Sequence, residues 1–65
     1  VQKQYEGSDR QVRGLVLREL RGSDTPVPLA VVEGLWPDAG QLARAVDGLV
    51  RDGLAVRAGD ELLLP

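Results

Sequence analysis

The chain has 65 residues, a length that allows one domain with a small core. It contains no Cys and no His, which excludes disulfides, the common zinc sites and histidine-based catalysis. The net charge of −2 and the pI of about 4.9 argue against strong autonomous binding to DNA. No apolar run reaches membrane-spanning length and no signal-peptide pattern is present, so we expect no membrane partner and a cytoplasmic setting.

The opening stretch, residues 1–7, is polar and shows no sustained period. We predict a linker or disordered lead-in there, followed by a folded domain over residues 8–65. Tyr5 is expected to pack at the domain edge, and stacking on a partner is the alternative. The chain begins at Val1 and contains no Met, which favours an excised domain over a whole gene product.

The first predicted helix opens at Ser8, which forms a capping box with Gln11, and it ends at Gly22. Its apolar residues recur at helical spacing and define one face: Val12, Leu15, Val16 and Leu20. Arg10 and Arg13 lie near the start of this helix. A solvated surface is the default role for both, and phosphate contacts are the alternative.

The segment 25–28 (TPVP) cannot be helix interior, because two prolines fix an extended backbone. It predicts an edge strand of one or two residues. A second helix of about two turns follows, with Pro28 in its first position and Trp36 near its end. Trp36 is expected to fill the corner between the second and third helices, with its indole N–H reaching a partner or water. Stacking on a base is the alternative, and it would require an exposed ring.

The third predicted helix begins after Asp38, which forms a capping-box variant with Gln41, and it stops at Gly53. Its apolar residues fall within a sector of about 140°: Leu42, Ala45, Val46, Leu49 and Val50. The opposite face carries Gly40, Arg44, Asp47, Gly48 and Arg51, flanked by Gln41 and Ala43. Its small residues would let another surface approach closely, or they reflect sequence drift.

Residues 54–57 alternate in polarity and face a second apolar run, residues 62–64, across a predicted turn at 58–61. The order is therefore helix, extended piece, helix, helix and hairpin. This order predicts a mainly α fold with a small β-hairpin, the winged helix-turn-helix, with three helices and a two-stranded wing. In that fold the third helix enters the DNA major groove and the wing follows the backbone or minor groove.

The candidate DNA-contacting residues follow from this geometry: Gln41, Arg44, Arg51, Arg57, Arg10 and Arg13. Arg44 and Arg51 are two helical turns apart, about 10.5 Å along the axis, and arginine suits phosphate and guanine contacts. Asp47 and the acidic wing tip, Asp60 and Glu61, oppose phosphate. We expect about three or four phosphate contacts, against six to ten in a strong binder, and hence weak, salt-sensitive, largely non-specific binding to duplex DNA.

Catalysis by this chain is not expected, because its Ser, Thr and Tyr side chains lack an activating His and lie at predicted caps, turns or the lead-in. No metal-ligand spacing is present, so we assign no catalytic or metal residue and expect no cofactor or small-molecule ligand. Three binding roles remain: an accessory DNA-binding module, a protein–protein docking module, or the DNA-binding domain of a transcription regulator. The acidic balance, the acidic wing and the small residues on the outer face of the third helix suit the docking module. The weakly basic face and the lack of a dimerisation element argue against the transcription regulator.

Several stretches resemble the C-terminal end of actinobacterial-type A/G-specific adenine DNA glycosylases. They are YEGSDRQVRG, PVPLAVVEGLWPD, QLARAVDGLVRDGLAVR and the terminal LLLP, and Ser8 to Gly14 is the most specific part. The resemblance does not extend to the Nudix-like C-terminal domain of better-known members.

The resemblance implies a role in base-excision repair of adenine mispaired with 8-oxoguanine. It places the catalytic residues and a 4Fe–4S cluster in a preceding domain of the parent enzyme, so none of them carries over to this chain. It implies an accessory winged-helix module that holds duplex DNA or positions the catalytic domain. The implied partners are duplex DNA and the catalytic domain of the parent chain.

Overall fold

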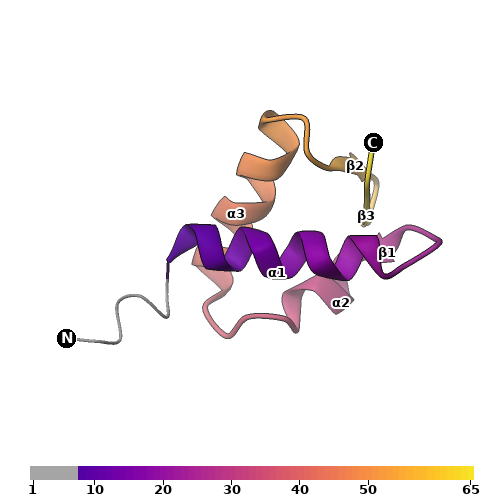
Figure 1. Cartoon of the computed structure of the whole chain (residues 1–65). Helices are drawn as coiled ribbons and strands as arrows, with labels where there is room; N and C mark the ends of the chain where they lie inside the picture. The colour runs from indigo at the N-terminus through magenta and orange to yellow at the C-terminus, as the bar shows by residue number, and fades with distance from the viewer. Residues whose placement is uncertain (1–7) are drawn as a thin grey trace.

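The computed structural model describes residues 8–65, which form three helices and a small sheet. The helices are α1 (Asp9–Arg21), α2 (Leu29–Glu33) and α3 (Ala39–Arg51), and the strands are β1 (Val27–Pro28), β2 (Val56–Ala58) and β3 (Glu61–Leu63). In Figure 1, α3 rises from behind α1, α2 lies below α1, and the strands gather near the C-terminus. This arrangement confirms the predicted mainly α, winged-helix fold class. The predicted lead-in, with Tyr5, lies outside the described residues.

Both long helices begin at the predicted side-chain caps. Ser8 Oγ accepts a hydrogen bond of 3.1 Å from the backbone N–H of Gln11, and Asp38 Oδ1 accepts one of 3.0 Å from that of Gln41. Each cap satisfies an N–H group that the first turn of a helix leaves unpaired. The caps therefore fix where α1 and α3 start.

The end of α3 is a Schellman motif, which turns the chain toward the wing. Gly53 has a φ of 78°, in the left-handed region that favours glycine. The N–H of Gly53 donates to the carbonyl of Val50 at 3.1 Å, and that of Leu54 donates to the carbonyl of Leu49 at 2.9 Å. The prediction that Gly53 stops the helix is confirmed.

The sheet has strand order β1-β3-β2, with both pairings antiparallel. The edge strand predicted from the two prolines is confirmed as β1, and it adds a third strand to the predicted two-stranded wing. The wing turn is shorter than predicted, because Ala58 and Glu61 pair with each other in the ladder. Gly59 opens the turn with a φ of 60°, and only this turn residue has positive φ, the pattern of a type II′ hairpin turn.

α2 is shorter than the two turns predicted, because Gly34 is already its C-cap and Trp36 lies beyond the helix. Pro28 is the N-cap of α2, with an extended ψ of 140°, so its prediction as the first helical residue was wrong. The backbone N–H of Leu29 donates to the carbonyl of Asp60 at 2.7 Å. The wing turn therefore helps to fix the start of α2, a constraint between distant parts of the chain.

The hydrophobic core lies between the helices and the central strand β3. Its buried residues are Val12, Val16, Leu20, Val27, Val32, Leu42, Ala45, Val46, Leu49, Ala55 and Leu62. Two residues predicted on inner faces, Leu15 and Val50, are only half-buried. Val50 still packs against the core, as does the half-buried Leu17 from α1. None of the helices in the described range is long and apolar enough to cross a membrane.

Candidate nucleic-acid interface

The outward face of α3 is narrow and carries two arginines. Its exposed residues are Ala39, Gly40, Ala43, Arg44, Asp47 and Arg51. Helical spacing places Arg44 and Arg51 along one edge of this face, and the small residues beside them keep the helix backbone accessible. Asp47 shares the face and weakens its positive potential. The structure therefore leaves two predicted contact residues, Arg44 and Arg51, exposed on one helix edge.

Arg57 lies on the other side of α3, in the wing. It is exposed on β2 and lines a groove of about 290 Å³ between α2, α3 and the wing. The groove has apolar walls with charged residues among them, and its lining is Leu29, Val32, Glu33, Ala39, Leu42, Ala43, Val46, Asp47 and Arg57. Positive charge therefore flanks α3 on both sides, with Asp47 between.

Gln41 does not lie on the outward face as predicted. Its side chain is only 8% exposed, and its Oε1 accepts a hydrogen bond of 2.9 Å from Trp36 Nε1. Its Nε2 donates to Asp9 Oδ1 at 3.1 Å. The prediction of a DNA contact from Gln41 is corrected accordingly, because its amide already links the turn before α3 to the first turn of α1. Gln41 flanks the apolar sector of α3, and the neighbouring helix α1 covers that flank.

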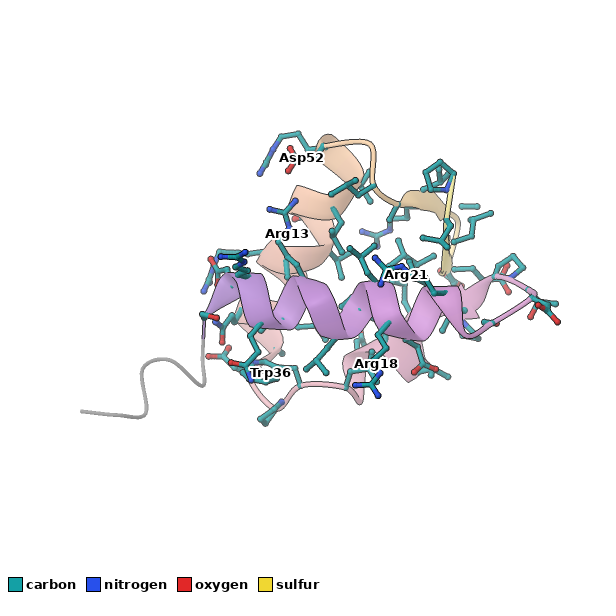
Figure 2. The ribbon with its side chains drawn as sticks, in the orientation of Figure 1. Arg13, Arg18, Arg21, Trp36 and Asp52 are labelled. Atoms are coloured by element: carbon teal, nitrogen blue, oxygen red, sulfur yellow. The ribbon has the colours of Figure 1, made fainter. Side chains whose placement is uncertain are left out.

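Trp36 fills the corner beside α3, as expected. It is half-buried against the core, and its indole N–H has Gln41 as its partner. Figure 2 shows the ring below the first turns of α1. A packed, hydrogen-bonded indole favours the structural role of Trp36 over stacking on a base.

Arg13 crosses from α1 to the end of α3, where its Nη2 lies 2.6 Å from Asp52 Oδ2. Figure 2 shows Arg13 pointing from α1 toward the end of α3, where Asp52 lies. The two side chains keep exposures of 33% and 46%, so water screens the pair and it contributes about 0.2–1 kcal/mol. Arg10, one turn earlier, is exposed. The two α1 arginines therefore differ, because Arg13 has an internal partner.

Gly48 is buried, although the sequence pattern places it on the outer face of α3. A Cβ added to Gly48 would lie 3.5 Å from Arg51 Nη2 and 3.9 Å from Arg13 Cζ. The surface that approaches this glycine is therefore the arginine of the neighbouring helix. Sequence reasoning missed Asp52 and this convergence, because 39 positions separate Arg13 from its partner and no local pattern joins them.

The charged side chains of the described residues differ in what they can bind. Within residues 8–65, no cluster of three or more His, Cys, Asp or Glu side chains could hold a metal ion. The four-cysteine iron–sulfur cluster that the resemblance implies for the parent enzyme does not fit this chain, whose 65 residues include no Cys. The exposed arginines, in contrast, suit anions with several oxygen acceptors, phosphates above all.

Fold and surface together define the class of protein: a winged-helix module with an arginine-bearing third helix. Comparison with known proteins confirms the resemblance and gives the relatives. The chain is 46% identical over 59 residues to the adenine DNA glycosylase of Mycolicibacterium smegmatis, and 42% identical over 57 residues to that of Mycobacterium tuberculosis. It is homologous to a segment of these adenine DNA glycosylases.

The matched segments cover 89% and 86% of this chain but 20% and 19% of the two relatives. The chain thus spans about a fifth of the length of the curated relatives it matches. No protein-family model matches the chain, and no solved structure matches it. The relatives support a connection with DNA repair, because their names state glycosylase action on adenine in DNA.

Proposed function

We propose that this chain acts as an accessory DNA-binding module of an adenine DNA glycosylase. It holds duplex DNA, or positions the catalytic domain on it, during repair of adenine mispaired with 8-oxoguanine in the cytoplasm. The observation that carries this proposal is the exposure of Arg44 and Arg51 on one edge of α3 in a winged-helix fold. Base removal belongs to the catalytic domain of the parent chain, and the module contributes affinity and orientation.

The binding mode follows from the geometry of the outward face. Gly40 and Ala43 keep the α3 backbone close to an approaching duplex, while Arg44 and Arg51 reach phosphates about 10.5 Å apart along the helix axis. Arg57 adds a contact from the wing. Asp47 repels phosphate and reduces the net gain. The sum is about three or four phosphate contacts, which gives weak binding that depends strongly on salt.

The test is the salt dependence of duplex binding by the whole 65-residue chain, measured by fluorescence anisotropy. Each phosphate contact contributes about −0.9 to the slope of log K against log salt concentration. The double variant Arg44→Ala/Arg51→Ala should therefore make the slope shallower by about 1.8. It should also weaken binding at low salt and leave the thermal unfolding curve near that of the wild type.

The matched control removes two arginines from another surface. Arg18 and Arg21 are both exposed in the second half of α1, and Figure 2 shows Arg18 pointing away from α3. Arg18→Ala/Arg21→Ala makes the same change in net charge but removes no proposed phosphate contact, so it should keep the wild-type slope. Equal slopes for the two double variants would show that α3 is not the contact surface.

A second candidate function is docking against the catalytic domain of the parent glycosylase chain. The groove between α2, α3 and the wing favours it, because its walls are apolar and Glu33, Asp47 and Arg57 supply both signs of charge. The relatives extend well beyond the matched segment, which gives such a surface a candidate occupant. Adding the catalytic part of the Mycolicibacterium smegmatis glycosylase as a separate chain should shift the NMR signals of groove residues. The shifts should persist at high salt, unlike DNA binding; shifts confined to the arginine edge of α3 would reject docking here.

A further inference from the structure

We propose that Arg13 and Arg51 form a phosphate clamp across Gly48, and that Asp52 competes with a DNA phosphate for Arg13. The clamp rests on the proposed DNA-binding function and adds a contact that neither helix provides alone. It also assigns Asp52 the role of an internal competitor, which lowers the affinity of the module for duplex DNA.

The geometry of the clamp comes from two helices that meet at a glycine. Arg51 Nη2 and Arg13 Cζ both lie within 4 Å of the position that a Cβ of Gly48 would occupy. The two guanidinium groups therefore approach one point from α3 and from α1. Because Gly48 has no side chain, nothing separates the two cations at that point. An oxygen-rich anion that meets the two guanidinium groups from their solvent side would accept hydrogen bonds from both.

The charges around this point favour an anion. In the part of the chain that the structure describes, Asp52 pairs with Arg13 and no carboxylate forms an ion pair with Arg51. Two positive groups thus face one negative group. Asp9 is the other carboxylate near this side of α1, and its Oδ1 already accepts from Gln41. A phosphate between the arginines would relieve their mutual repulsion, which Asp52 does only at Arg13.

Solvent reaches both guanidinium groups of the clamp, because Arg51 is exposed and the Arg13 side chain is 33% exposed. A shallow hollow between α1 and the end of α3 is lined by Asp9, Arg10, Arg13, Gly14, Leu17, Leu49 and Leu54. Arg10 brings a further positive charge to its rim. A backbone phosphate that approaches α3 from its arginine edge would meet Arg51 first and then Arg13. The hollow borders Arg13 and so leaves open space on the α1 side of the clamp.

Competition follows from the exposure of the Arg13–Asp52 pair. Both side chains are partly exposed, at 33% and 46%, so the pair opens readily in water. A bound phosphate takes over Arg13 and leaves the Asp52 carboxylate to water. Removing the carboxylate charge should therefore tighten duplex binding by about 1.4- to five-fold, the range that corresponds to an exposed ion pair.

The experiment compares Asp52→Asn with Asp24→Asn in duplex titrations of the whole chain at low salt. Asp24 is exposed in the turn after α1, so its variant makes the same change in net charge far from the clamp. Asp52→Asn should bind about 1.4- to five-fold tighter than Asp24→Asn. In an Arg13→Ala background, Asp52→Asn should give no gain beyond that of the control. Equal affinities of the two Asn variants, or a gain that persists without Arg13, would overturn the clamp.

A second measurement keeps the clamp testable if one of the variants is unstable. Arg13→Ala alone should make the salt slope shallower by about 0.9, the value for one phosphate contact, and a slope equal to that of the wild type would contradict the clamp. Thermal melting of each variant reports whether it is folded. If Arg44→Ala/Arg51→Ala changes the slope while Asp52→Asn matches its control, the clamp fails and the DNA-binding function stands. If the wild type binds no duplex at low salt, both fail.

Discussion

Replacing Gln41 with alanine should destabilise the fold more than any change on the outward face of α3. Gln41→Ala removes the acceptor of the Trp36 indole N–H and the donor to Asp9 Oδ1, hydrogen bonds of 2.9 and 3.1 Å. It leaves the backbone N–H of residue 41 on the Asp38 cap, so α3 keeps its start. The variant therefore tests the link between α1 and the turn before α3.

The expected loss can be worked out from the two bonds. The bond to Trp36 is neutral and contributes about 0.5–1.5 kcal/mol. The bond to the Asp9 carboxylate belongs to a stronger class, but Asp9 is exposed and regains water, so we take about 1 kcal/mol for it. Alanine returns a few tenths of a kcal/mol through its higher helix propensity. The net loss is about 1.5–2 kcal/mol, which lowers the Tm of a chain this small by about 10 °C.

Thermal and urea unfolding, followed by circular dichroism and by the fluorescence of Trp36, measure this loss. Arg44→Ala is the matched control, since it truncates an exposed neighbour on the same helix and should stay within about 0.5 kcal/mol of the wild type. A Trp36→Phe/Gln41→Ala double-mutant cycle isolates the coupling between the two side chains. If Gln41→Ala unfolds like Arg44→Ala, the bridge does not hold the helices together and the reasoning is refuted.

Two glycines give predictions of opposite sign. Gly48→Ala should stabilise the fold by up to about 1 kcal/mol, because a Cβ there meets Arg51 and Arg13 at 3.5 and 3.9 Å, which is ordinary contact. A lower Tm would show that the two guanidinium groups cannot accommodate the methyl group. Gly59→Ala should destabilise by about 1–2 kcal/mol, because a φ of 60° is strained for alanine. Urea unfolding measures both variants, and an unchanged midpoint for Gly59→Ala would contradict the type II′ turn.

Local sequence patterns were enough to predict the order of helices and strands, because helix caps, helix stops and turns each depend on residues a few positions apart. The caps at Ser8 and Asp38 and the stop at Gly53 depend on side chains and backbone within one turn, and all three are confirmed. Helical spacing likewise predicted most of the buried residues of α1 and α3. The length of α2 was missed because the glycine at position 34 ends it before the apolar pattern does.

The candidate site was harder to predict, because its geometry depends on how α1 lies against α3. Helical spacing places Gly48 on the outer face of α3 and Gln41 at its flank, and this spacing does not show which part of that face another helix covers. The neighbouring helix decides the outcome, and it buries both. The pairing of Arg13 with Asp52 is similarly non-local. Sequence therefore predicted the arginines of the outer edge, but not the residues between the helices.

The central position of β3 has a consequence for the order of folding. Leu62 is fully buried, and its strand pairs with β1 on one side and with β2 on the other. All three helices precede Leu62 in the chain, so Leu62 is the last residue of the core to be synthesised. Until then, the β1 edge and the core beneath it stay uncovered. Closure of the core should thus wait for β3, and removing residues 62–65 should leave a loosely packed helical intermediate.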